Sequence, residues 1–135
     1  MFMNAFEDVS RIQIFSVKDL EQELNRIRDI CSIPNMEWEK RIECLRKFRS
    51  LLVAGAADYE EFYLYLKPLE VPFQTSVKDL RSQVVREACI SIAYLSQRIG
   101  NKFVIIFLNI DQLIIHLLFF PFIDVIDLLK HCFQL

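Results

Sequence analysis

The sequence repeats one plan, in which a helix and a short polar loop are followed by a second helix. This pattern first runs from about Lys18 to Leu52, and it recurs from about Tyr59 to Ile99. In both copies apolar residues recur every three or four positions, which is the spacing of one buried helical face. Neighbouring copies of such a unit bury their apolar faces against each other. We therefore predict an all-α chain of stacked helical hairpins.

The distance between the copies indicates the type of repeat. The second helices begin near Trp38 and Arg81, a separation close to the period of roughly 40–47 residues found in HEAT and armadillo repeats. With only two glycines and four prolines, the chain has few residues for the tight turns of a β-rich fold. We predict an α-solenoid fragment with an N-terminal arm at 1–15, HEAT repeats at about 16–55 and 56–100, and an apolar C-terminal helical tail at 104–135.

Local signals mark the ends of the helices. Ser16 is followed three residues later by Asp19, a pattern that predicts a helix start. Gly55 and Gly100 follow helical segments and predict their C-terminal ends. In the arm, Ile12, Ile14 and Phe15 are candidates to anchor the chain on the first helix pair.

The third and fourth helices have weaker boundary signals. Pro68 and Pro72 predict the end of the third helix, because proline disfavours a helical conformation at the residue before it. Ser76 and Asp79 predict the cap of the fourth helix, whose apolar stripe would begin at Leu80.

Charged residues within the second helices have a structural interpretation. Arg41, Arg86 and Glu87 lie inside these helices, where we expect salt bridges along or between them. Surface pairs of this kind contribute only about 0–1 kcal/mol each.

Equivalent loops of stacked repeats lie along one edge. Trp38 with Lys40 would then join Lys78 with Arg81 in one exposed aromatic and basic edge, suited to an acidic protein surface. Each residue also has a structural interpretation. Trp38 could cap the first helix pair, and Lys78 and Arg81 could be ordinary solvated charges.

Composition and motifs argue against several classes of function. The formal net charge is −2, which argues against a nucleic-acid binder that relies on phosphate contacts. The cysteines (Cys31, Cys44, Cys89 and Cys132) form no C-x-x-C pair, so we expect neither a disulfide framework nor a zinc site. A glycine-rich phosphate loop and a nucleophile elbow are both absent from the sequence. We expect no enzymatic activity, no cofactor and no metal.

The tail differs from the rest of the chain. Apolar residues occupy 22 of the 32 positions from 104 to 135. The stretch 104–123 has the length of a transmembrane span, but Asn109, Asp111, Gln112 and His116 interrupt it. The alternatives are a helix that covers the end of the second repeat, a membrane anchor, or a surface for self-association.

Several stretches resemble a known family. Arg49–Tyr59 (RSLLVAGAADY) and Lys78–Cys89 (KDLRSQVVREAC) closely resemble the second TOG domain of the CLASP (cytoplasmic linker associated) proteins. Phe6–Val9 (FEDV) and Gly100–Phe103 (GNKF) resemble the same domain. The likeness covers residues 6–103 and stops where the family continues into a third repeat. The sequence is then a shortened form of such a protein, or its last residues come from outside the coding region.

The resemblance implies a fold and a function. TOG domains are arrays of six HEAT repeats whose intra-repeat loops contact tubulin. The aromatic residue of the first loop is matched by Trp38, and the basic residue of the second by Lys78, with Arg81 beside it. The family stabilises microtubules at plus ends, the spindle and kinetochores, which implies a cytoplasmic, cytoskeletal location. The alternative is a helical scaffold or dominant-negative fragment that does not bind tubulin.

Overall fold

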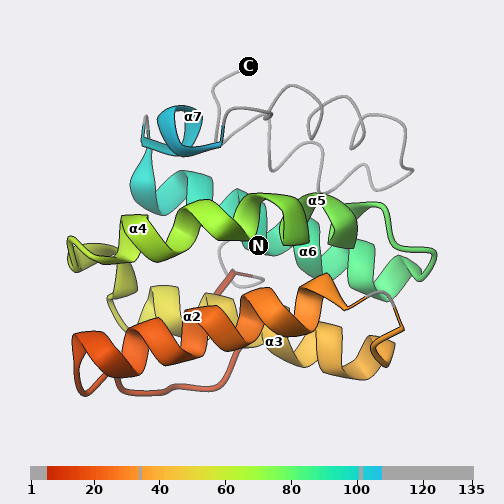
Figure 1. The fold of residues 1–135 in the computed structure, drawn as a ribbon, viewed down its shortest axis with the longest axis horizontal. Coiled ribbons are helices and arrows are strands. Elements are labelled where there is room, and N and C mark those ends of the chain that lie inside the picture. Colours follow the sequence, from red (N-terminus) through yellow and green to blue (C-terminus); the bar gives the residue numbers. More distant parts are fainter. Residues whose placement is uncertain (1–5, 34, 101, 108–135) are drawn as a thin grey trace.

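The computed structural model describes residues 6–33, 35–100 and 102–107, and this part of the chain is helical without a strand. The helices are α2 (Val17–Ser32), α3 (Trp38–Val53), α4 (Phe62–Leu66), α5 (Glu70–Val77), α6 (Ser82–Ile99) and α7 (Lys102–Ile106). They form two layers, with α2, α4 and α5 in front of α3 and α6 (Figure 1). Helix α2 packs on α3, α5 packs on α6, and α3 packs on α6. The predicted all-α fold of HEAT type is confirmed.

The front helical segment of the second hairpin continues past its prolines as consecutive α and 3-10 segments. Helix α4 passes through a 3-10 turn, Lys67–Leu69, directly into α5. Pro68 lies in the first turn of the 3-10 segment, and Pro72 in the first turn of α5. Proline is tolerated at these positions because the first-turn N–H groups have no partner within the helix. The prediction that Pro68 and Pro72 close the third helix is therefore wrong.

The remaining helix ends follow the local sequence. The Ser16 side chain accepts the backbone N–H of Asp19 at 3.1 Å, and the Asp19 carboxylate accepts that of Phe15 at 3.3 Å. Ser16 is therefore the N-cap of α2, and Asp19 fixes the chain just before it through Phe15 instead of completing a capping box with the Ser16 N–H. Gly55 and Gly100 have positive φ angles of 95° and 59°, a conformation that glycine adopts without steric cost. Both predicted glycine stops are confirmed.

The core lies between the two helical layers. Phe48 of α3 is fully buried in it, and its ring packs edge-to-face with that of Phe73, with the centroids 5.0 Å apart. Leu20, Leu24 and Ile27 of α2 supply part of the front layer. The thiols of Cys31, Cys44 and Cys89 are free and buried. They act as small apolar core groups, as the sequence predicts.

The arm contacts the helices through alternate residues. Ile12 and Ile14 pack partly buried against the core, whereas 79% of Phe15 is exposed. Side chains of an extended segment alternate in direction, so Phe15 faces away when its neighbour faces inward. Phe15 is not an anchor. That role belongs to Phe6, which is buried and stacks on Tyr94 with a centroid distance of 5.0 Å.

A buried ionic network joins the two hairpins. Arg49 of α3 is 1% exposed, and its guanidinium lies 2.7 Å from the Glu87 carboxylate of α6. Arg49 also donates to the Ser91 hydroxyl at 2.9 Å. Arg46 reaches the same carboxylate at 3.2 Å and donates to the Asp8 carbonyl of the arm at 2.8 Å. Glu87 is therefore a structural residue that ties α3 to α6.

The other charged residues predicted to be structural differ from one another. Arg41 is buried and pairs with Asp79 across the two hairpins, so it resembles Glu87 rather than a surface charge. Arg86 is exposed on α6 and lies outside this network. The low energy expected for a surface pair does not apply to Arg41 or Glu87, because both take part in largely desolvated contacts.

The start of the tail packs on the second hairpin. Phe103 and Phe107 are buried, and their rings lie 4.9 Å apart. The Lys67 ammonium donates to the Ile106 carbonyl at 2.6 Å. Within the described part of the chain, no helix has the length and apolarity to cross a membrane. The membrane and self-association hypotheses concern 104–135, of which residues 108–135 lie outside the described residues.

Replacing Glu87 with Ala should destabilise the fold strongly. The substitution leaves the Arg49 guanidinium buried without its carboxylate, and breaking a buried pair in this way costs about 3–5 kcal/mol. Thermal and urea unfolding of the full chain would measure the loss. Arg86→Ala, one residue away and exposed, serves as the control and should stay within about 0.5 kcal/mol of the original chain. Equal stability of the two variants would contradict a structural role for the network.

Candidate functional site

The intra-hairpin loops lie at the same end of the molecule, at the right in Figure 1. One loop connects α2 to α3, and the other connects α5 to α6. Between them is an open groove of about 760 Å³. We call this groove and its rim the loop edge. Its lining residues are Met36, Glu37, Trp38, Glu39 and Arg41 from the first hairpin, and Thr75, Lys78, Asp79, Leu80 and Arg81 from the second.

Three of the four predicted site residues meet in this groove. Trp38 is the first residue of α3, and it packs partly buried against the core while its ring lines the groove. The guanidinium of Arg81 lies over that ring, 5.1 Å from its centroid, which is a cation–π contact. Lys78 is exposed in the second loop. The ring packs against the core and still lines the groove, so the capping interpretation of Trp38 does not exclude the contact interpretation.

Lys40 does not join them. It is exposed on α3 and lies outside the lining of the groove. An α-helix turns about 100° per residue, so a side chain two positions after Trp38 points to a different side of the helix. Proximity in sequence is therefore a poor guide to which lysine faces the groove.

A largely buried ion pair positions the second loop against the first. Arg41 is 5% exposed, and its guanidinium lies 3.3 Å from one oxygen of the Asp79 carboxylate. The same guanidinium donates to the Ile33 carbonyl in the first loop. The other Asp79 oxygen accepts the backbone N–H of Arg81 at 2.8 Å. Asp79 thus joins the first hairpin to the residue whose side chain covers Trp38.

The predicted cap of the fourth helix is wrong. Helix α6 begins at Ser82, and Arg81 at its N-cap makes no side-chain capping bond. Ser76 is buried in α5, where its hydroxyl donates to the Pro72 carbonyl at 2.9 Å. Asp79 is engaged by Arg41 and by the Arg81 backbone instead. The start of α6 next to Arg81 agrees with the repeat spacing, and only the predicted capping residues are wrong, because Asp79 holds the loop backbone before the helix.

Leu80 also departs from its predicted place. The sequence suggests that it begins the apolar stripe of the fourth helix, but its side chain is fully exposed in the loop. The buried stripe begins at Val84. Leu80 is therefore a surface residue of the loop edge that sequence periodicity assigns to the core.

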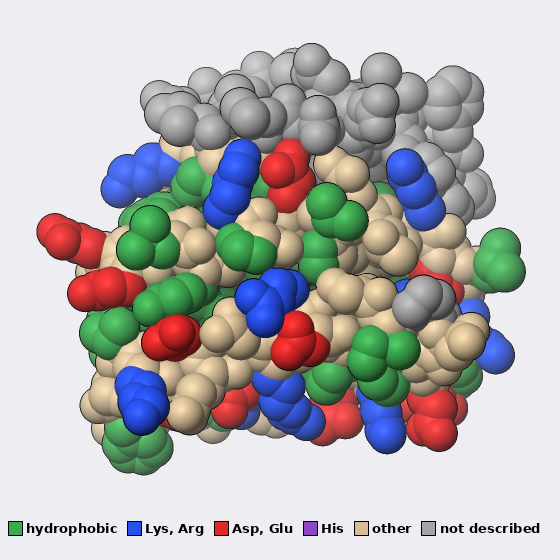
Figure 2. Space-filling model, in the orientation of Figure 1, with side chains coloured by type: hydrophobic (Ala, Val, Ile, Leu, Met, Phe, Trp, Pro, Cys, Tyr) green, Lys and Arg blue, Asp and Glu red, His purple; other side chains and the backbone are tan. Residues whose placement is uncertain are grey.

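The charge of the groove is mixed rather than purely basic. Lys78 and Arg81 contribute positive charges, whereas Glu37 and Glu39 contribute negative ones from the first hairpin. Over the face drawn in Figure 2, cationic and anionic side chains are likewise interspersed. The sequence shows that the neighbours of Trp38 are charged, but only the structure shows that these two glutamates border the groove. The loop edge therefore carries positive and negative side chains close together.

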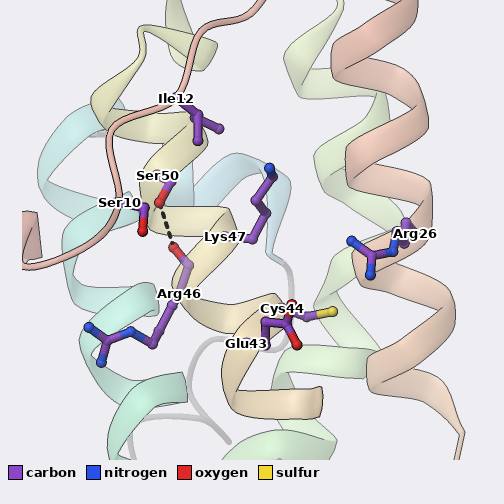
Figure 3. A pocket seen from close by; sticks show the side chains of 8 residues that line it. All are labelled: Ser10, Ile12, Arg26, Glu43, Cys44, Arg46, Lys47 and Ser50. Carbon is purple, nitrogen blue, oxygen red and sulfur yellow. Dashed lines mark hydrogen bonds between the residues drawn. The ribbon is translucent and has the colours of Figure 1, made fainter. Parts of the chain in front are cut away.

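A second cleft lies beside the arm (Figure 3). It is about 280 Å³ in volume and is formed by Ser10 and Ile12 of the arm, Arg26 of α2, and five residues of α3. The three cations along it do not converge, because Arg46 turns toward α6, where it pairs with Glu87. This cleft is the seam between the arm and the first hairpin.

The described cysteines are poorly suited to nucleophilic or redox chemistry. Burial raises the pKa of Cys31 and of Cys89 to about 12, because the apolar surroundings disfavour the thiolate. Burial also raises the pKa of Cys44. Within the described residues, no group of three or more His, Cys, Asp or Glu side chains is placed to hold a metal ion.

The stacked hairpins and the shared loop edge define the described chain as an α-solenoid of the HEAT type. No family model matches the sequence. CLIP-associating protein 1-A of Xenopus laevis is 56% identical to it over 102 residues, or 76% of this chain. The CLIP-associating protein of Drosophila melanogaster is 41% identical over 103 residues, or 75% of the chain. Protein CLASP-3 of Caenorhabditis elegans is 37% identical over 101 residues, or 73% of the chain.

These identities confirm the family resemblance. The matched part of the chain is a segment of the CLIP-associating protein (CLASP) family. The chain spans 7% of the length of the Xenopus and Drosophila relatives and 10% of the Caenorhabditis relative.

Replacing Arg81 with Ala should change the surroundings of Trp38. Because Trp38 is the single tryptophan of the chain, intrinsic fluorescence reports on this ring alone. Without the guanidinium above it, the ring meets more water, so its emission should shift to longer wavelength and acrylamide should quench it more strongly. Arg86→Ala, which removes an exposed arginine of α6 outside the groove, should leave both readings unchanged. Identical spectra for the two variants would contradict the stacked arrangement.

Proposed function

We propose that this chain is a non-enzymatic tubulin-binding module and that the loop edge is its contact surface. The observation that carries the proposal is the convergence of Trp38, Lys78 and Arg81, from both hairpins, on one groove. The homology to a CLASP segment supports tubulin as the partner. Tubulin exposes an acidic surface, which lysine and arginine side chains on a positioned loop complement.

The contributions of the three residues should differ. The ring of Trp38 offers a large apolar area that is already partly ordered by packing, and tryptophan is enriched among residues that dominate binding energy. Lys78 is exposed and should act mainly on the rate of association and on specificity. Arg81 orients the tryptophan ring and can meet a carboxylate of the partner. Lys40, which faces away from the groove, should contribute little.

Glu37 and Glu39 should make the loop edge selective for the orientation in which a partner binds. Their carboxylates border the cationic residues, so an acidic partner must place its negative charges on Lys78 and Arg81 and away from the glutamates. Like charges held together across an interface cost free energy and disfavour incorrect orientations. This arrangement favours one orientation on tubulin over diffuse binding to any acidic surface.

The proposed function sets an expected location. A chain that binds tubulin through this edge should be found in the cytoplasm, on the microtubule cytoskeleton and on the spindle. Since the chain corresponds to a small part of its relatives, its contact area should be smaller than that of a longer repeat array. We therefore expect weaker binding than such an array would show.

Binding should depend on the loop edge when the full chain is sedimented with microtubules. Trp38→Ala and Lys78→Glu should each weaken binding roughly tenfold or more, because the first truncates a dominant contact residue and the second places a like charge against the acidic partner. Lys18→Ala is the matched control, because Lys18 is exposed near the other end of α2 and should leave binding unchanged. Circular dichroism would verify that each variant is folded. Equal sedimentation of the original chain and both loop variants would contradict the proposal.

A further inference from the structure

The second loop presents a leucine to solvent inside the proposed binding surface. Leu80 has a relative exposure of 102%, compared with 71% for Leu64 on α4 and 67% for Val71 on α5. A single exposed apolar residue is ordinary on a protein surface. Leu80 differs because it borders the same groove as the ring of Trp38 and the cations of Lys78 and Arg81.

The backbone on either side of Leu80 is held by hydrogen bonds. The N–H of Lys78 donates to the Thr75 carbonyl at 3.2 Å, and that of Asp79 donates to the Ser76 carbonyl, also at 3.2 Å. On the other side, the Arg81 N–H donates to the Asp79 carboxylate at 2.8 Å. The leucine therefore projects from an ordered turn, so little backbone freedom remains to be lost on binding.

The turn also explains why Leu80 is not buried in the core. Asp79 is tied to Arg41 of the first hairpin, and Arg81 has an extended backbone at φ −93° and ψ 122° before α6 begins. Leu80 is held between them on the solvent side. Its apolar surface does not stabilise the fold of the chain alone. It would provide a favourable hydrophobic free energy only when another molecule covers it.

We infer that Leu80 is a direct contact residue for tubulin, inserting into an apolar recess that is flanked by carboxylates. The inference rests on the proposed function. The spacing of the groups defines the chemistry of the partner surface: an apolar patch opposite Leu80 and Trp38, and acidic groups opposite Lys78 and Arg81. An apolar group between charged ones also makes the contact partly independent of salt, because ionic strength screens only the charged pairs.

The test compares tubulin binding by full-length variants at low and at high ionic strength. Leu80→Ser should weaken binding about tenfold under both conditions, the loss expected when one leucine is no longer buried. Leu80→Met, which keeps an apolar side chain of similar size, should remain within about twofold of the original chain. The defect of Lys78→Ala should shrink as salt is raised. Leu80 is fully exposed, so none of its variants should shift the thermal midpoint of the free chain.

The outcomes separate this inference from the proposed function. If Leu80→Ser binds like the original chain while Lys78→Ala is weakened, the role of Leu80 is overturned and the loop edge stands. If the binding loss of Leu80→Ser disappears at high salt, the claim that Leu80 makes an apolar contact is likewise overturned. If the original chain does not bind tubulin under either condition, the proposed function and the inference both fail.

Discussion

The buried contact between Arg49 and Glu87 is the interaction on which the arrangement of the hairpins depends. An arginine that is 1% exposed has lost nearly all of its hydration, a cost that only close and well-placed partners can offset. Glu87, the Ser91 hydroxyl and the Glu87 carbonyl all face the guanidinium. Because these groups belong to α6 and Arg49 belongs to α3, the contacts form only when the two helices pack in this register.

The same register brings the loops together at one end. A second ionic tie, between Arg41 and Asp79, lies at that end and connects the loops directly. Since Asp79 also holds the backbone of Arg81, the position of the guanidinium over Trp38 follows from helix packing rather than from the loop alone. The proposed binding surface is consequently ordered before a partner arrives, which lowers the entropy cost of association.

Much of this fold could be predicted from the sequence, because helical periodicity and end signals are local. The N-cap at Ser16 and the stop at Gly55 depend only on neighbouring residues, and both are confirmed. The errors arise where tertiary contacts override a local signal. Pro72 lies in the first turn of α5 instead of ending a helix, because a 3-10 segment precedes α5 and opens a new first turn.

The candidate site was predictable in outline for a similar reason. The repeat period places the loops of Trp38 and Lys78 along one edge, and the groove contains both. The exposure of Leu80 could not be predicted, because Leu80 precedes other apolar residues at helical spacing. That spacing indicates a core residue even where, as here, the helix has not yet begun. The anchoring role of Phe6 was missed as well, since its partner Tyr94 is distant in sequence. Such contacts require the fold before they can be inferred.

The most direct test of this account is hydrogen–deuterium exchange of the full chain with and without tubulin. The account predicts that tubulin slows exchange in peptides covering the first loop with the start of α3, and the second loop with the start of α6. Peptides from α4, which lies away from these loops, should exchange at the same rate in both samples. Protection confined to α4, or exchange that is unchanged throughout the chain, would contradict the assignment of the loop edge as the tubulin-binding surface.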